Sequence, residues 1–242
     1  MKKVTVAEAT QAINESKSIT FLTGAGVSTP SGIPDYRSLK GIYQGIEQPE
    51  YLLSHEAMVH EPQKFYSFVK KIYHPNAQPN VIHTEIARLE KYKKVWTVSQ
   101  NIDGLHEKAG SQQLVNFHGT LYHCYCRKCG KEVAWQSYLH SDTHVNCGGQ
   151  VRPAIVLYGE GFQEEVLEQA TFAVSQAELV VIVGTSFQVH PFCDLIQFRA
   201  PRAKILVINQ SPIYLDQEYD FVQTDGVTVF DKIKELGVNY DD

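Results

Sequence analysis

The sequence predicts an α/β protein built on a doubly wound parallel sheet, and three observations support this prediction. Short apolar segments alternate along the chain with segments of amphipathic, helical periodicity. The apolar segments at 18–23, 95–99 and 179–183 are rich in β-branched residues, as expected of parallel strands that are buried on both faces. The first of them runs directly into a glycine-rich turn, which is typical of a phosphate-binding loop.

The predicted helices and strands of the sheet follow one another in a regular order. They are a helix at 4–16, a strand at 18–23, a helix at 80–91, strands at 95–99, 114–117 and 151–159, a helix at 164–175, strands at 179–183, 204–208 and 227–230, and a helix at 231–236. Two segments interrupt this alternation. Residues 38–79 predict an inserted helical module with helices at 50–60 and 63–73, and residues 120–152 form a cysteine-rich insertion.

Composition excludes several classes of protein. The 242 residues carry a formal net charge of −5, whereas a general nucleic-acid binder needs clustered Lys and Arg to contact phosphates. The chain starts with a polar, amphipathic segment, and its longest apolar run, 179–183, is too short to cross a membrane. We therefore expect a cytoplasmic protein with no nucleic-acid partner and no membrane partner, and we expect it to be a monomer.

Polar or glycine-rich turns follow three of the predicted strands. The first turn places Gly24 and Gly26 directly after a strand, and residues 34–37 then add a proline, an acid, an aromatic residue and a guanidinium. Gly-Ala-Gly alone is more often a tight turn than a nucleotide site, and the third glycine of the dinucleotide fingerprint comes too late here. Residues 100–103 and 184–186 end two further strands. Open α/β sheets bind ligands at the carboxyl ends of their strands, so these turns indicate a ligand site.

The cysteines predict a metal site. Their odd number, five, argues against a disulfide framework. Cys126 and Cys129 form a Cys-x-x-Cys knuckle, and His144 and Cys147 form a His-x-x-Cys pair after a gap that is normal for a zinc ribbon. Four such ligands would close a structural zinc site. Cys124 competes with His144 as fourth ligand, and we prefer His144 because it preserves the two-knuckle geometry; a knuckle that has lost its metal is the alternative.

Taken together, the motifs resemble those of one family. In chain order they are Gly-Ala-Gly-Val-Ser at 24–28, Ser-Gly-Ile-Pro-Asp-Tyr-Arg-Ser at 31–38, Gln-Asn-Ile-Asp-Gly-Leu-His at 100–106, His-Gly at 118–119, the cysteine-rich insertion, Arg-Pro at 152–153, Tyr-Gly-Glu at 158–160, Gly-Thr-Ser at 184–186 and Asn209. This order is similar to that of the sirtuins over nearly the whole chain. The chain looks like a bacterial single-domain sirtuin without long terminal extensions.

The resemblance implies an NAD-dependent protein lysine deacylase. In the family's mechanism the acyl oxygen attacks C1′ of the nicotinamide ribose, and the products are free lysine, nicotinamide and 2′-O-acyl-ADP-ribose. The resemblance also implies a Rossmann-like, NAD-binding large domain, made of 1–37, 80–119 and 153–242. The helical module (38–79) and a zinc ribbon (120–152) would form a small domain, with NAD and an acyl-lysine protein or peptide substrate in the cleft between the two.

Individual residues acquire expected roles from the same resemblance. His118 would be the general base, because an imidazole titrates near neutral pH. Asn101 and Asp103 would hold the ribose and the carboxamide of the nicotinamide nucleoside, although Asp103 could instead cap a helix. His118 and Asn101 are the expected catalytic residues. The expected NAD-binding residues are Gly24, Ala25, Gly26, Ser28, Thr29, Tyr36, Arg37, Gln100, Asn101, Ile102, Asp103, Gly184, Thr185, Ser186, Asn209 and Val227.

An extended peptide would add as a strand between two loops. Its expected contact residues are Val156, Tyr158, Gly159, Glu160, Phe187 and Val189. Sirtuins that prefer acidic acyl groups carry a Tyr-x-x-Arg pair in the helical module, whereas residues 38–79 contain no arginine. We therefore expect acetyl and longer apolar acyl groups to be preferred.

Two other functions remain open. One is an NAD-dependent protein mono-ADP-ribosyltransferase, in which a protein side chain captures the ribose carbon. The other is a non-enzymatic zinc-ribbon protein that binds NAD as a sensor. The ribbon of such a protein would need a basic face, and this chain is acidic overall. The intact Gln-Asn-Ile-Asp and His-Gly motifs favour deacylation over both.

Overall fold

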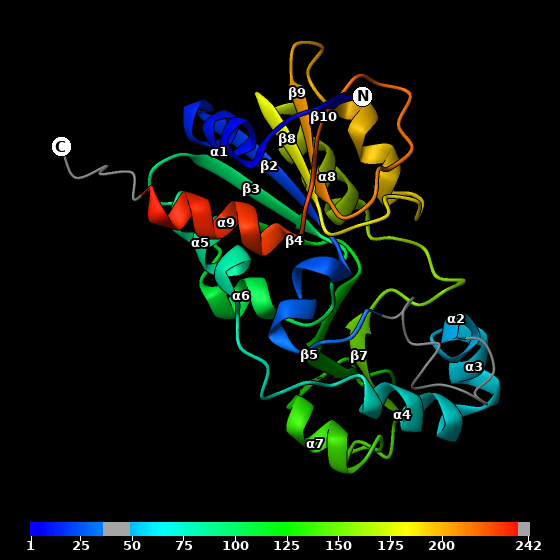
Figure 1. The fold of residues 1–242 in the computed structure, drawn as a ribbon. Helices are drawn as coiled ribbons and strands as arrows, with labels where there is room; N and C mark the ends of the chain where they lie inside the picture. Colours follow the sequence, from blue (N-terminus) through cyan, green and yellow to red (C-terminus); the bar gives the residue numbers. More distant parts are fainter. Residues whose placement is uncertain (36–48, 237–242) are drawn as a thin grey trace.

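The largest element of the computed structural model, which describes residues 1–35 and 49–236, is a parallel sheet of seven strands (Figure 1). In spatial order the strands are β1 (Lys2–Lys3), β10 (Asp220–Gln223), β9 (Lys204–Asn209), β8 (Leu179–Val183), β2 (Ser18–Thr23), β3 (Lys94–Ser99) and β4 (Leu114–Asn116). Every neighbouring pair is parallel. Because the chain continues from β2 toward β3 and later starts β8 on the other side of β2, the topological switch point lies between β2 and β8.

Helices cover both faces of this sheet, as a doubly wound fold requires (Figure 1). Three of them pack together on one face, namely α1 (Val6–Glu15), α5 (Val81–Leu89) and α9 (Gly226–Glu235). On the other face α8 (Glu164–Ser175) packs beside the 3-10 helix η4 (Phe192–Phe198). Each face has its own apolar core, with Ile13, Ile86 and Phe230 in one and Ala173 and Phe192 in the other. Within residues 1–35 and 49–236, no helix combines the length and the apolar character needed to span a membrane.

A second, smaller sheet belongs to the ribbon, and the helices of the helical module pack against it. It has the order β6 (Glu132–Val133), β5 (Gly119–Cys126) and β7 (Val151–Ile155), and both pairings are antiparallel. Its helices are α2 (Pro49–Leu52), α3 (His55–His60), α4 (Pro62–Lys71) and α7 (Trp135–His140). Met58 and Phe65 of the helical module share a core with Leu121, Tyr138 and Val151 of the ribbon. The two insertions therefore fold against each other although they are far apart in the sequence.

Two sequence predictions about strands are wrong. Residues 151–159 do not return to the parallel sheet, because β7 pairs antiparallel with β5. Residues 227–230 are helical and lie in α9, and the strand that completes the large sheet is β10. The side chain of Asp225 accepts a hydrogen bond from the backbone N–H of Thr228, so a helix cap starts α9 and outweighs the β-branched residues that predicted a strand.

Candidate functional site

A cavity of about 910 Å³ lies at the carboxyl edge of the parallel sheet. Its walls come from the turns that follow β2, β3 and β8, and from the loop after β7. This is the switch-point edge, where open α/β sheets bind ligands. The site residues predicted from the sequence that line it are Gly24, Ala25, Ser28, Gln100, Asn101, Ile102, Asp103, His118, Val156, Tyr158, Gly159, Glu160, Gly184, Thr185, Ser186 and Val189.

Two glycine turns, which follow β2 and β8, pack against each other at this edge of the sheet. Strands β2 and β8 are paired in register, so the turns after them start at the same level. The N–H of Gly26 donates to the carbonyl of Gly184 at 2.8 Å, and a Cβ on Gly26 would lie 2.8 Å from the Gly184 Cα. Gly184 itself has a φ of 63°, which favours glycine. Gly26 therefore contacts the neighbouring turn and does not line the cavity.

Asn101 and Asp103 are held by the turn after β2. The Asn101 side-chain amide donates to the Gly24 carbonyl and to the Ser28 hydroxyl, both at 3.0 Å. Ser28 donates in turn to Asp103 Oδ2 at 2.6 Å, while Asp103 Oδ1 accepts from the N–H of Leu105 at 2.9 Å. Burial raises the pKa of the Asp103 carboxyl above its ordinary value. Asp103 thus lines the cavity and also binds the first turn of α6 (Leu105–Ala109).

His118 lies at the end of β4, with one ring nitrogen facing the protein backbone. Its Nδ1 is 3.0 Å from the carbonyl oxygen of Gln100. A carbonyl can only accept, so Nδ1 carries the proton and Nε2 keeps its lone pair. The ring contacts Phe162 and Phe192, and burial lowers the pKa of His118 below its ordinary value. The imidazole is therefore neutral at pH 7 and can accept a proton at Nε2.

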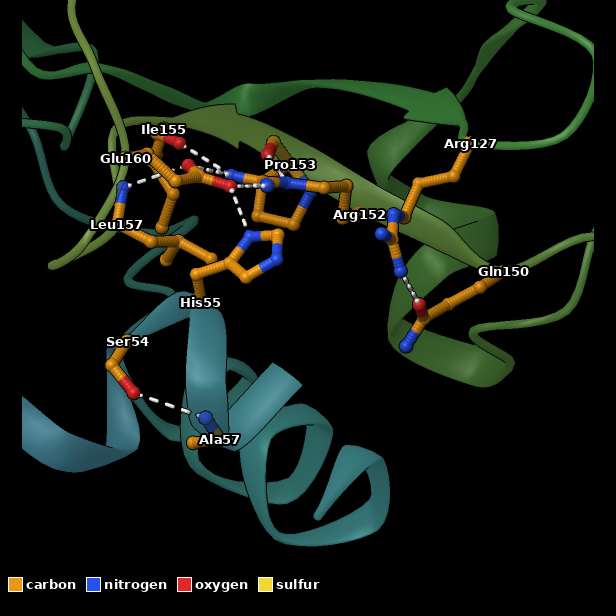
Figure 2. A network of polar contacts seen from close by, with 10 residues as sticks. All are labelled: Ser54, His55, Ala57, Arg127, Gln150, Arg152, Pro153, Ile155, Leu157 and Glu160. Atoms are coloured by element: carbon orange, nitrogen blue, oxygen red, sulfur yellow. Dashed lines mark hydrogen bonds and ion pairs between the residues drawn. The ribbon is translucent and has the colours of Figure 1, made fainter. Parts of the chain in front are cut away.

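The loop after β7 is fixed by an ion pair between the buried Arg152 and the part-buried Glu160 (Figure 2). Arg152 donates to both carboxylate oxygens of Glu160, at 2.5 and 3.0 Å, and the N–H of Leu157 and Nδ1 of His55 also contact this carboxylate. Although burial raises the pKa of Glu160, the hydrogen bonds from Arg152, Leu157 and His55 lower it to about 2. Both oxygens are occupied by the protein itself, so Glu160 shapes the loop. The sequence carried no signal for the part played by His55.

A backbone bridge ties the same loop to the helical module. The N–H of Tyr158 donates to the Leu53 carbonyl at 3.0 Å, and the N–H of His55 donates to the Tyr158 carbonyl at 2.9 Å. At the start of the loop, the N–H of Val156 donates to the carbonyl of His118 at 2.9 Å. The loop therefore connects the helical module to the strand end that carries His118.

Several predicted site residues lie outside the cavity lining. Thr29 is exposed and donates to the Gly26 carbonyl at 3.1 Å. The Phe187 side chain is buried in a core, and Val227 packs partly buried on α9. Asn209 donates to the Thr185 carbonyl at 3.0 Å, so it holds a residue that lines the cavity without lining it itself. Tyr36 and Arg37 lie outside the residues that the structure describes.

The predicted zinc ligands converge at the tip of the ribbon. Nδ1 of His144 lies 3.2 Å from Cys147 Sγ and 3.3 Å from Cys129 Sγ, and Cys126 Sγ lies 3.5 Å from Cys147 Sγ. The edges of a tetrahedral zinc site with these ligands are about 3.5–3.8 Å long. Cys124 lies elsewhere, with its Sγ 3.5 Å from the Tyr73 hydroxyl. Of the two candidates for fourth ligand, His144 joins the cluster, which fits a closed, structural zinc ion.

The fold and the cavity define a Rossmann-like protein whose ligand site at the switch point is covered by a metal-binding module. A model of the Sir2 family matches residues 24–191. The chain therefore belongs to the Sir2 family, and the resemblance to the sirtuins is confirmed.

Relatives and solved structures agree with this membership. The chain is 60% identical over 230 residues to a protein of Enterococcus faecalis named NAD-dependent protein deacetylase, covering 95% of this chain and 97% of that protein. A structure described as the structural basis of sirtuin substrate affinity superimposes with a TM-score of 0.87 at 31% identity, over 97% of this chain and 100% of the other. A Sir2 variant with a deacetylated p53 peptide and 3′-O-acetyl ADP ribose gives a TM-score of 0.86 at 30% identity, over 97% and 99%.

Proposed function

We propose that this protein is an NAD-dependent protein lysine deacetylase that consumes NAD as a co-substrate. The observation that carries the proposal is the convergence of Asn101, Asp103 and the free Nε2 of His118 on one cavity beside the two glycine turns. The Enterococcus faecalis relative bears the name of this activity, and the solved Sir2 variant was captured with a deacetylated peptide and an acetylated ADP ribose. Both support the proposal.

NAD would be bound mainly by polar groups of the cavity that are already held in place by the protein. The turn at 24–28 and the turn at 184–186 would face the diphosphate, because residues of both turns line the cavity at the carboxyl ends of parallel strands, where α/β sheets bind phosphates. Asn101 and Asp103 would contact the nicotinamide ribose and its carboxamide. Their hydrogen bonds to Ser28 and to the backbone hold them in place before any ligand binds, which reduces the ordering cost of binding.

The proton chemistry would fall to His118. Its neutral ring directs the lone pair of Nε2 away from the Gln100 carbonyl, so that it can take the proton of a ribose hydroxyl as that hydroxyl attacks. Phe162 and Phe192 pack against the ring and cover part of it. The backbone bond between Gln100 and Nδ1 also stabilises the imidazolium that results, since Nδ1 carries a proton in both states.

The acyl-lysine side of the cavity is largely apolar. Leu53 and Ile72 from the helical module line it together with Ile102, Ile155 and Leu157, and all five belong to the core that the helical module and the ribbon share. Among the described residues that line the cavity, none is a Lys or an Arg. Such a wall suits an acetyl or a longer apolar acyl group. The peptide backbone would pair with the loop at 156–160 and with Val189.

The test is NAD-dependent turnover of an acetyl-lysine peptide, followed by mass spectrometry of the products. We expect free lysine peptide and acyl-ADP-ribose from the wild type, and a loss of about 100- to 10,000-fold in kcat for His118→Ala. His140→Ala, which alters an exposed histidine of the ribbon, is the matched control and should keep full activity. Equal turnover by His118→Ala and wild type would refute the base, and ADP-ribosylated protein as the main product would favour the transferase.

A further inference from the structure

A second cluster of metal-ligating side chains lies at the edge of the cavity. Ligand atoms of His190, Cys193 and Asp194 all lie within 4.8 Å of one another. His190 Nδ1 is 2.7 Å from Asp194 Oδ2 and 3.5 Å from Cys193 Sγ. In a tetrahedral zinc site, nitrogen and sulfur ligands are about 3.5 Å apart. The His–Cys pair already has this separation, whereas the shorter, exposed His–Asp contact must lengthen when an ion enters.

The backbone beneath this cluster is firmly held. Phe192, Leu195 and Ile196 belong to the same turn as the three donors and are buried in the core on this face of the sheet. The N–H of Cys193 donates to the Val189 carbonyl at 3.0 Å, and the N–H of Asp194 donates to the Pro191 carbonyl at 3.1 Å. The three donors therefore leave one rigid turn on the same side, so little backbone ordering would oppose the binding of an ion.

A surface ion pair accounts for the arrangement only in part. The His190 and Asp194 side chains are 73% and 40% exposed, and contacts this exposed contribute little to stability. Cys193, the third group of the cluster, packs partly buried against the core on this face, and its sulfur also lies within reach of His190. Imidazole, thiolate and carboxylate together form a donor set suited to zinc and to similar divalent transition metals, and unsuited to calcium or magnesium.

We propose that His190, Cys193 and Asp194 form a second metal site, which takes a divalent transition-metal ion of the zinc class. When the ion binds, the Cys193 sulfur bonds to it and the thiol proton passes to solvent. Three protein ligands leave the fourth position open, unlike the closed cluster of the ribbon. The site adjoins the ligand cavity, because His190 and Val189 both line it.

The test uses the full-length protein with zinc already in the ribbon, and Co²⁺ as the probe. We expect one additional Co²⁺ per chain and a thiolate-to-cobalt absorption band, while metal analysis shows that the ribbon keeps its zinc. Cys193→Ser and His190→Ala should weaken this binding by about 100-fold or more. They should leave the ribbon zinc unchanged, because both residues lie outside the ribbon cluster. Serine is close in size to cysteine, so Cys193→Ser largely preserves the packing of this partly buried side chain.

Two results would overturn the proposal. One is a wild-type protein that takes up no Co²⁺ beyond the ribbon. The other is Cys193→Ser binding Co²⁺ as tightly as wild type and with the same absorption. His140→Ala, an exposed histidine outside the cluster, serves as control for loss of an adventitious surface ligand and should bind Co²⁺ like wild type. Because the readout is metal binding, the result does not depend on deacetylase activity.

Discussion

The Arg152 guanidinium and the Glu160 carboxylate form a bidentate ion pair, with Nη1 2.5 Å from Oε1 and Nη2 3.0 Å from Oε2. The Arg152 side chain is only 5% exposed. It also donates to the Ile155 carbonyl at 2.6 Å. Removing Glu160 would leave the buried Arg152 charge without a partner. The resulting loss of stability is larger than the net stabilisation that the intact pair provides.

We therefore expect Glu160→Gln to lower the free energy of unfolding by about 3 kcal/mol at pH 7, as measured by urea denaturation. Gln150→Ala is the matched control, since it breaks an exposed Arg–Gln hydrogen bond from Arg127 in the same region (Figure 2). That control should change stability by less than about 0.5 kcal/mol. A Glu160→Gln protein as stable as wild type would show that the pair does not hold the loop.

Two buried histidines should make the fold sensitive to mild acid. The rings of His83 and His106 lie 4.7 Å apart, and burial lowers the pKa of both, that of His83 to about 4. The same groups in the unfolded chain titrate near 6.5. Between pH 6.5 and 4 the unfolded chain therefore binds more protons than the folded one, so stability falls as the pH decreases through this window.

Replacing one of these histidines should reduce that pH dependence. For His83→Gln we expect the slope of unfolding free energy against pH to be smaller, by up to about 1.4 kcal/mol per pH unit between pH 6.5 and 4. The measurement is urea denaturation at several pH values. Protons also displace zinc from the ribbon, but they do so in both proteins, so the slopes can be compared. His140→Gln, at an exposed site, should keep the wild-type slope.

Metal analysis of single variants should identify the ribbon ligands. Cys129→Ser and His144→Ala should lose zinc and unfold more readily, because a structural zinc ion contributes its binding free energy to folding. Cys124→Ser should keep a full equivalent of zinc, since the Cys124 sulfur contacts the Tyr73 hydroxyl and not the cluster. Zinc loss from Cys124→Ser together with zinc retention in His144→Ala would reverse the assignment.

Acyl preference should follow the apolar wall of the cavity. We expect an acetylated peptide to be turned over faster than its succinylated twin, because none of the described lining residues is a Lys or an Arg that could pair with the extra carboxylate. A buried, unpaired carboxylate would be costly to desolvate. The two peptides should be compared by kcat/KM at the same NAD concentration. Faster turnover of the succinylated peptide would contradict this prediction.

The sheet was largely predictable because its central strands are continuous apolar segments, which is the pattern of strands buried on both faces. Every residue of β8, and all but the first of β2, is buried, and both strands have the predicted bounds. Strand β10 was missed because only two of its four residues are buried between polar ends. Strand β7 was misplaced because the choice between two sheets depends on pairing with β5, a long-range contact that local sequence does not encode.

The candidate site was predictable where it follows strand ends and unpredictable where it depends on pairing. Gln100, Asn101 and Asp103 follow β3, and the sheet geometry alone brings them to the cavity. The contact of Gly26 with Gly184 joins two turns that are far apart in the chain. Position along the chain indicates neither this contact nor the way in which Arg152, Leu157 and His55 all bind the Glu160 carboxylate.

The Tyr158 bridge also limits how the cleft can move. Leu53 and His55 of the helical module bond to the N–H and to the carbonyl of Tyr158, and the helical module and the ribbon share one core. A rigid-body displacement of the module must carry this loop with it. The hinge must therefore lie in the segments that enter and leave the smaller sheet, close to the bond between Val156 and His118. The helical module, the ribbon and the loop at 156–160 would then move as one piece relative to the glycine turns.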